Sequence, residues 1–290
     1  GKRIHFGCTT NATLINDEVI RFWRSYGMGF HTSIDGIPVC HDMHRRFASG
    51  GGSSFLVEPG VKKILSYRPE VCARATFSPD TVRHLLDNVD YFYKLGYTHM
   101  AFVMSEGDDW DDVSLGLLAK GMEQMSEFYL DKCRKGVILY IQHIDQILER
   151  LLRPRPRKAP CGAGLGLLSI AVDGTIWPCH RWRKHGEVWA MGNIFGGFRD
   201  DIRKTFCDFN LYKDTKANCN KCPASIVCGG FCISTSLEQT GSIDIPFKGY
   251  CFMMRTTLRE SKRILYTLTN EGNRLFRDKY LYKERRRENE

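Results

Sequence analysis

The chain has 290 residues, of which 42% are hydrophobic and 26% charged, and its formal net charge at pH 7 is +9. These proportions allow a folded core and exclude a disordered chain, a collagen and a coiled coil. No apolar run reaches the roughly 18 residues of a membrane span, and the N-terminus lacks the apolar core of a signal peptide. The basic residues are interleaved with 33 acidic ones, which disfavours a nucleic-acid partner. We therefore expect a cytoplasmic globular protein without a membrane partner.

Strand patterns alternate with helix patterns through the first half of the chain. Short strands are predicted at 3–10, 29–34, 71–77 and 99–104, and helices follow them, notably at 53–67 and 78–95. Asn16-Asp17 and Ser78-Pro79 are typical helix starts, and Gly96 is a typical helix end. This alternation predicts a parallel sheet with helices packed outside it. Since four strands make an incomplete barrel, we expect residues 1–152 to form part of a (β/α) barrel.

The second half has a different composition. Residues 153–160 contain three prolines and three arginines, which predicts a linker. A cysteine-dense region follows at 161–252. In the last segment, 253–290, leucines at near-heptad spacing predict one helix from about Met254 to Leu281, followed by a charged tail.

Eight of the 12 cysteines lie between Cys161 and Cys251, and they carry the clearest chemical signal. Four of them form the compact motif Cys219-x2-Cys222-x5-Cys228-x3-Cys232. Cys161 and Cys179 precede this motif, and Cys251 follows it. In a chain without an export signal, such pairs indicate metal or iron–sulfur ligation more than disulfides. Two pairs could hold one tetrahedral zinc, but seven cysteines exceed a zinc site and suit two iron–sulfur clusters. Cys207 is a spare ligand whose use the spacing leaves open.

This cysteine pattern resembles the SPASM domain of radical S-adenosylmethionine (SAM) enzymes. Earlier segments are also similar to that family: Thr10-Asn-Ala-Thr-Leu-Ile15, Ser33-Ile-Asp-Gly36, His41-Asp-Met-His-Arg45 and Arg74-Ala-Thr-Phe-Ser-Pro79. Cys161-Gly-Ala-Gly164 and Trp177-Pro-Cys-His-Arg181 look like segments of its peptide-modifying members. The resemblance implies an α/β fold, with the C-terminal part of a (β/α)6 barrel at 1–152, a SPASM domain at 161–252 and a C-terminal helix.

The resemblance also implies cofactors and site residues. Two auxiliary 4Fe-4S clusters are expected, a distal one held by Cys219, Cys222, Cys228 and Cys251, and a proximal one held by Cys161, Cys179 and Cys232, with one iron lacking a cysteine. Asn11, Ser33 and Arg74 are expected to meet SAM where barrel strands end, although Asn11 and Ser33 are also typical of turns. His180 stands where the sulfatase-maturing branch has an aspartate base; it could transfer a proton or pack beside the cluster.

Two segments of the family are absent from the 290 residues: the Cys-x3-Cys-x2-Cys motif that holds the SAM cluster, and Gly-Gly-Glu-Pro. We therefore expect an N-terminally truncated chain, with a degenerate relative as the alternative. The resemblance implies a full-length enzyme with SAM and a third 4Fe-4S cluster. A SAM-derived radical would abstract hydrogen from a ribosomal peptide or protein, thioether formation being a candidate outcome, with flavodoxin or ferredoxin as electron donor. The rival interpretations are a zinc-binding Cys-rich module and a non-catalytic peptide-binding partner.

Overall fold

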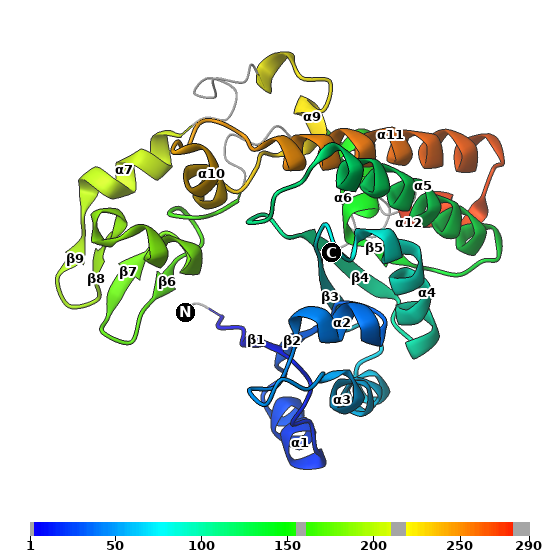
Figure 1. Cartoon of the computed structure of the whole chain (residues 1–290), viewed down its shortest axis with the longest axis horizontal. Coiled ribbons are helices and arrows are strands. Elements are labelled where there is room, and N and C mark those ends of the chain that lie inside the picture. The colour runs from blue at the N-terminus through cyan, green and yellow to red at the C-terminus, as the bar shows by residue number, and fades with distance from the viewer. Residues whose placement is uncertain (1–2, 155–160, 210–218, 281–290) are drawn as a thin grey trace. The chain divides into compact units, whose positions relative to one another are not determined.

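A computed structural model describes residues 3–154, 161–209 and 219–280 (Figure 1). The chain divides into two compact units, Gly1–Leu152 with Thr256–Glu290, and Arg153–Arg255. Most of the expected linker at 153–160 lies outside the described residues. Among the described helices, none has the length and apolar character that crossing a membrane requires.

The first unit contains a five-stranded parallel sheet whose strands lie side by side in chain order (Figure 1). The strands are β1 (Gly7–Thr10), β2 (Gly29–Ser33), β3 (Cys72–Phe77), β4 (His99–Met104) and β5 (Tyr140–Ile141). The predicted α/β fold with a parallel sheet is therefore confirmed. The fifth strand was not predicted, because its two residues are too few to show an alternating pattern. The helix α6 (Gln142–Leu152) follows it directly.

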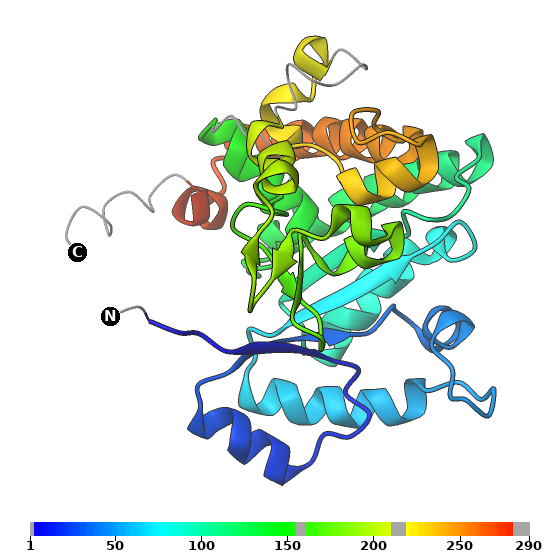
Figure 2. The same ribbon diagram turned by 90° about the vertical axis from the view of Figure 1, so that its left-hand side faces the viewer.

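Helices cover one face of this sheet. Trp23 of α1 packs on Phe30 of β2 with ring centroids 4.3 Å apart, and Phe92 of α4 packs on Phe102 of β4 at 5.7 Å. Figure 2 shows α1 and α3 together on the same side of β1 and β2. Arg74 points to the opposite face and is exposed, so that face is available for polar chemistry. The covering helices are α1 (Asp17–Ser25), α3 (Ser54–Tyr67), α4 (Leu85–Leu95), α5 (Asp112–Arg134) and α6 (Gln142–Leu152).

The helix ends follow local chemistry. Asn16 caps α1 by accepting the Val19 amide hydrogen at 2.9 Å, and Gly96 ends α4 with φ +103°, both as predicted. Ser78 does not directly begin α4: residues 79–81 form a turn, in which the Ser78 carbonyl accepts from the Thr81 and Val82 amides. A short 3-10 helix, η1 (Val82–His84), precedes α4, and the unpredicted helix α2 (Pro38–His44) follows β2.

The prediction of a single C-terminal helix is wrong. The segment forms two helices, α11 (Lys248–Asn270) and α12 (Arg274–Tyr280). Gly272 adopts φ +61° between them, and Asn273 starts α12 by accepting the Phe276 amide hydrogen at 2.9 Å. These two residues stop one helix and begin the next. Leu281, the expected helix end, lies outside the described residues.

The second unit is built on a small antiparallel sheet in the order β6-β7-β8-β9. Its core is strongly aromatic and includes Trp177, Trp182, Phe206, Phe231 and Phe247. Short helices surround that core and place the cysteines, as described below. The elements are β6 (Ser169–Ile170), β7 (Thr175–Trp177), η2 (His180–His185), η3 (Glu187–Trp189), β8 (Gly192–Asn193), β9 (Gly197–Phe198), α7 (Asp200–Asp208), η4 (Cys219–Lys221), α9 (Ser225–Cys228) and α10 (Ile233–Thr240).

Candidate functional site

Four cysteines of the second unit line one pocket: Cys219, Cys222, Cys228 and Cys251. They are supplied by η4 and the residue after it, by the last residue of α9, and by the first turn of α11. Two backbone hydrogen bonds shape the segment from Cys219 to Cys228. The Cys222 amide donates to the Cys219 carbonyl at 3.2 Å, and the Cys228 amide donates to the Ala224 carbonyl at 2.7 Å. The remaining wall is largely apolar, with Ala224, Phe231, Pro246 and Met254. The pocket is thus a group of thiols against an apolar surface.

The electrostatics of this pocket favour bound cations. Burial and the neighbouring thiols Cys228, Cys219 and Cys222 together raise the pKa of Cys251 to about 11, while Arg255 opposes them. Several thiolates this close repel one another unless positive charge lies between them. Metal ions supply that charge, and thiolate is the form that ligates them. The donor set therefore fits a thiolate-bound metal group.

Cys179 and Cys232 form a second, separate set. Cys179 is 9% exposed and belongs to the aromatic core with Trp177 and Trp182. Burial raises its pKa, and the charge of Cys232 raises it further, so the two sulfur atoms lie within electrostatic reach of each other. Cys161, the third expected member of this set, is exposed.

Two residues that the sequence left ambiguous are exposed. His180, the first residue of η2, is exposed, which argues against a packing role beside the core. Cys207 lies on α7 and is exposed, whereas its neighbour Phe206 is buried in the aromatic core. The side chain of Cys207 therefore points away from the core that Cys179 borders.

In the first unit, Ser33 and Arg74 are partners in the register of β2 and β3. Since paired residues of a sheet project to the same face, the two side chains lie side by side on the face opposite α1 and α4. Asn11 follows β1, and its Oδ1 accepts from the amide of Thr13 at 3.2 Å and from the Thr13 hydroxyl at 2.9 Å. The structure thus brings Ser33 beside Arg74 and shows Asn11 in a side-chain-stabilised turn.

Sequence reasoning missed a buried ion pair next to these residues. Asp35, 5% exposed, accepts from Arg45 Nε at 2.5 Å and Nη2 at 3.1 Å, and from the Thr76 amide at 2.8 Å. These contacts clamp the loop after β2 onto β3. Gly36 permits this packing, because it has φ +135° and a Cβ there would lie 1.9 Å from Asn88 Oδ1.

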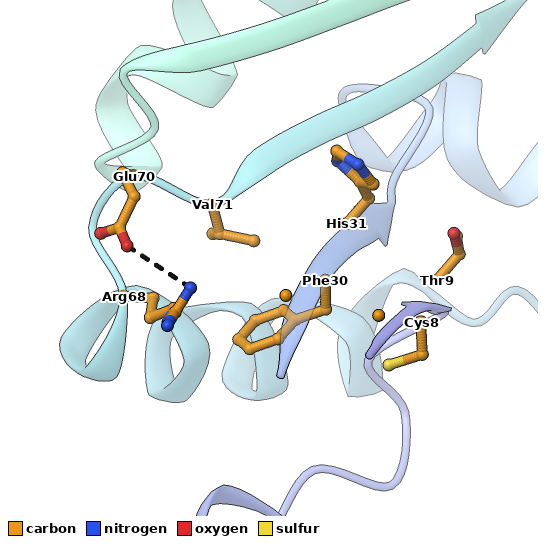
Figure 3. Close-up of a pocket in the computed structure, with 9 residues that line it drawn as sticks. Cys8, Thr9, Phe30, His31, Arg68, Glu70 and Val71 are labelled. Atoms are coloured by element: carbon orange, nitrogen blue, oxygen red, sulfur yellow. Dashed lines mark ion pairs between the residues drawn. The ribbon is translucent and has the colours of Figure 1, made fainter. Parts of the chain in front are cut away.

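A different pocket, of about 450 Å³, lies where the strands begin (Figure 3). Its lining includes Gly7 of β1, Gly29 of β2 and Val71 just before β3, and an Arg68–Glu70 ion pair of 3.8 Å stands at its edge. Asn11 and Ser33 lie at the other ends of their strands. Since reactive groups of parallel barrels gather where strands end, this pocket is not the candidate SAM site.

Comparison with known proteins gives distant relatives and no matching family model. A cysteine-type anaerobic sulfatase-maturating enzyme of Clostridium novyi is 24% identical over 235 residues, which cover 76% of this chain and 62% of that protein. A serine-type anaerobic sulfatase-maturating enzyme of Bacteroides thetaiotaomicron is 22% identical over 278 residues, 86% of this chain and 67% of that protein.

Solved structures agree with this relationship. Native anSMEcpe with bound AdoMet, which is SAM, has a TM-score of 0.75 at 18% identity, covering 92% of this chain and 76% of that one. Streptococcus suis SuiB bound to the precursor peptide SuiA has a TM-score of 0.56 at 15% identity, covering 86% of this chain and 59% of that one. Fold and comparisons together point to the radical SAM/SPASM class. Over most of its length the chain is distantly similar in sequence to anaerobic sulfatase-maturating enzymes and similar in fold to SuiB, and it spans 62% of the first curated relative.

Proposed function

We propose that the chain is part of a radical SAM/SPASM enzyme that modifies a ribosomally made peptide or protein, and that region 161–252 carries two auxiliary 4Fe-4S clusters. The observation that carries the proposal is the division of the cysteines into two groups. Four line one pocket, and Cys179 and Cys232 lie near each other elsewhere. Relatives with related folds support it, since one binds AdoMet together with the Cp18Cys peptide and another binds a precursor peptide.

The arrangement supports clusters over a zinc-binding module. A zinc ion holds four sulfur atoms at about 2.3 Å from one centre. In a four-iron cluster each cysteine binds a different iron, so its sulfur atoms lie farther apart. Within 3–154, 161–209 and 219–280, no three or more His, Cys, Asp or Glu side chains are grouped so as to hold a single metal ion. Seven candidate cysteines exceed the four ligands of one zinc ion, and their division between two places suits two clusters.

Residues of the barrel portion would bind SAM on the sheet face opposite α1 and α4. Arg74 offers charged N–H donors that suit the SAM carboxylate, and Ser33 offers a hydroxyl beside it. The Asp35–Arg45 pair holds the adjoining loop against β3 through the Thr76 amide. With SAM bound, the cofactor would supply the radical chemistry, and a flavodoxin or ferredoxin would deliver electrons. In this chain's other unit, the exposed His180 could take up a substrate proton.

We favour thioether formation over formylglycine formation, although the curated relatives are sulfatase-maturating enzymes. The proximal set has three cysteines for four irons, which leaves one iron open to a substrate thiolate; Cys207, as exposed as Cys161, is the competing internal ligand. Coordination would keep that thiolate deprotonated. His180 differs in charge and reach from the aspartate of the sulfatase-maturing branch, which disfavours the aldehyde product.

The proposal is tested by anaerobic reconstitution of the 290-residue chain. We expect about eight iron and eight sulfide per chain and absorbance near 400 nm. Stoichiometric zinc without acid-labile sulfide would contradict the proposal. The same sample should form no deoxyadenosine from SAM with dithionite, because the chain lacks Cys-x3-Cys-x2-Cys; deoxyadenosine formation by the pure chain would show that it cleaves SAM by other ligands.

A further inference from the structure

Arg181 lies beside a sulfur atom of the second cysteine set. Its Nη1 donates to Thr235 Oγ1 at 2.7 Å and lies 3.9 Å from Cys232 Sγ, within reach of an N–H···S hydrogen bond. Thr235 is buried, so its hydroxyl fixes the guanidinium. The Cys232 sulfur is therefore faced by the positively charged Arg181 guanidinium, which the buried Thr235 hydroxyl holds in place.

Both cysteines of this set stand at the start of a helix. Cys232 is the residue immediately before α10, which has eight residues, and Cys179 immediately precedes η2. Unpaired amide hydrogens at the start of a helix carry partial positive charge. Cys232 thus occupies the N-cap position of α10 without a side-chain capping bond, and its Sγ lies near the Arg181 guanidinium.

Arg181 also helps to hold the two helices together. Besides the Arg181–Thr235 bond, His185 Nε2 lies 2.9 Å from Ser234 Oγ, and an exposed ion pair joins Lys184 to Glu238. These contacts dock η2 on α10, and they thereby bring the cysteines at the two helix starts to one place.

We propose that Arg181 is a positioning residue that holds Cys232 for the proximal cluster and makes that cluster easier to reduce. The proposal rests on the proposed function, because it requires that this set of cysteines holds an iron–sulfur cluster. Reduction adds one electron to the cluster and leaves its sulfur atoms more negative. A nearby positive charge and hydrogen bonds to sulfur stabilise that form and raise the reduction potential.

The test compares Arg181→Gln with the parent chain after anaerobic reconstitution, by a redox titration followed by EPR. We expect one of the two cluster signals to shift to a more negative potential and the other to stay. Arg181→Lys, which keeps the positive charge but lacks the planar guanidinium, should shift the same signal less. Thr235→Val should shift it in the same direction, because the guanidinium loses its anchor.

Arg183→Gln is the matched control. Arg183 lies in the same helix but is exposed and lines a different pocket, so its loss should leave both potentials unchanged. Loss of about four iron in Arg181→Gln, with retention in Arg181→Lys, would also support the positioning role. Parent potentials and full iron in Arg181→Gln would overturn it. A parent chain without iron and sulfide would instead refute the proposed function, so the two failures are distinguishable.

Discussion

Cys228 and Cys232 are four residues apart in the sequence but lie in different sites. Cys228 lines the four-cysteine pocket, whereas Cys232 lies beside Arg181. In an unbroken helix, residues four apart share one face. Here α9 ends at Cys228, and Gly229 and Gly230 follow with φ +66° and +100°. The two glycines turn the chain and separate the cysteines.

Replacing Gly230 should therefore disturb metal binding. A left-handed backbone costs a residue with a Cβ about 1–2 kcal/mol, and relief of that cost would rotate Cys232 relative to Cys228. We expect Gly230→Ala to retain less iron than the parent after reconstitution. Gly241→Ala is the control, because Gly241 has φ +71° at the other end of α10. Equal iron in both variants would show that this turn does not separate the ligands.

Single cysteine substitutions should remove one cluster at a time. Cys251→Ser removes a ligand from the four-cysteine pocket, and Cys179→Ser removes one from the other set. Each should retain about four iron per chain, and the EPR signals left in the two variants should differ. Cys133→Ser, in the helix α5 of the first unit, should keep the full amount. Identical residual signals in the first two variants would argue against two separate sites.

Asp145 anchors the C-terminal end of the first unit. It is fully buried and accepts from the Ile141 amide at 2.6 Å and the Tyr129 hydroxyl at 3.2 Å, and also from Lys279 and Tyr280. Asp145→Asn would leave the Lys279 charge uncompensated in a mostly buried site. We expect the free energy of unfolding to fall by about 3 kcal/mol in urea titrations.

The control for Asp145 is an exposed ion pair of the same unit, Lys135–Asp131. Lys135→Met should change the free energy of unfolding by less than about 1 kcal/mol, since solvent screens exposed pairs. A loss of similar size in both variants would mean that the Asp145 network contributes no more than a surface pair. Asp145→Asn combined with Lys279→Met should recover part of the loss.

His143 should make the stability depend on pH. Burial lowers its pKa to about 4 from the ordinary 6.5, and its buried Nδ1 has no hydrogen-bond partner among the residues that the structure describes. The unfolded chain therefore binds a proton at higher pH than the folded chain, so stability that is present above pH 6.5 is lost as pH falls toward 4. At pH 5 the loss amounts to about 2 kcal/mol.

Urea titrations at pH 7 and pH 5 check this expectation. His143→Gln should lose less stability between the two pH values than the parent. His5→Gln, at an exposed position, should lose as much as the parent. The same pH dependence in His143→Gln and the parent would contradict the argument.

The sequence alone determined the local features. Asn16 and Gly96 marked helix ends because capping depends on one side chain or one left-handed residue. Strand 99–104 was predicted with its observed bounds, His99–Met104, because its apolar run is bounded by turns. The cysteine spacing identified the candidate metal ligands, because closely spaced cysteine pairs are unusual without a chemical cause.

Only the tertiary structure decided which distant residues meet. Neither spacing nor composition pairs Asp35 with Arg45 and the Thr76 amide, because that network forms only after β2 and β3 lie side by side. The sequence likewise gives no sign of the role of Arg181. That role depends on the docking of η2 on α10, more than fifty residues away, which places Arg181 beside Thr235 and Cys232. Hydrogen bonds between such segments follow from packing, which no local pattern encodes.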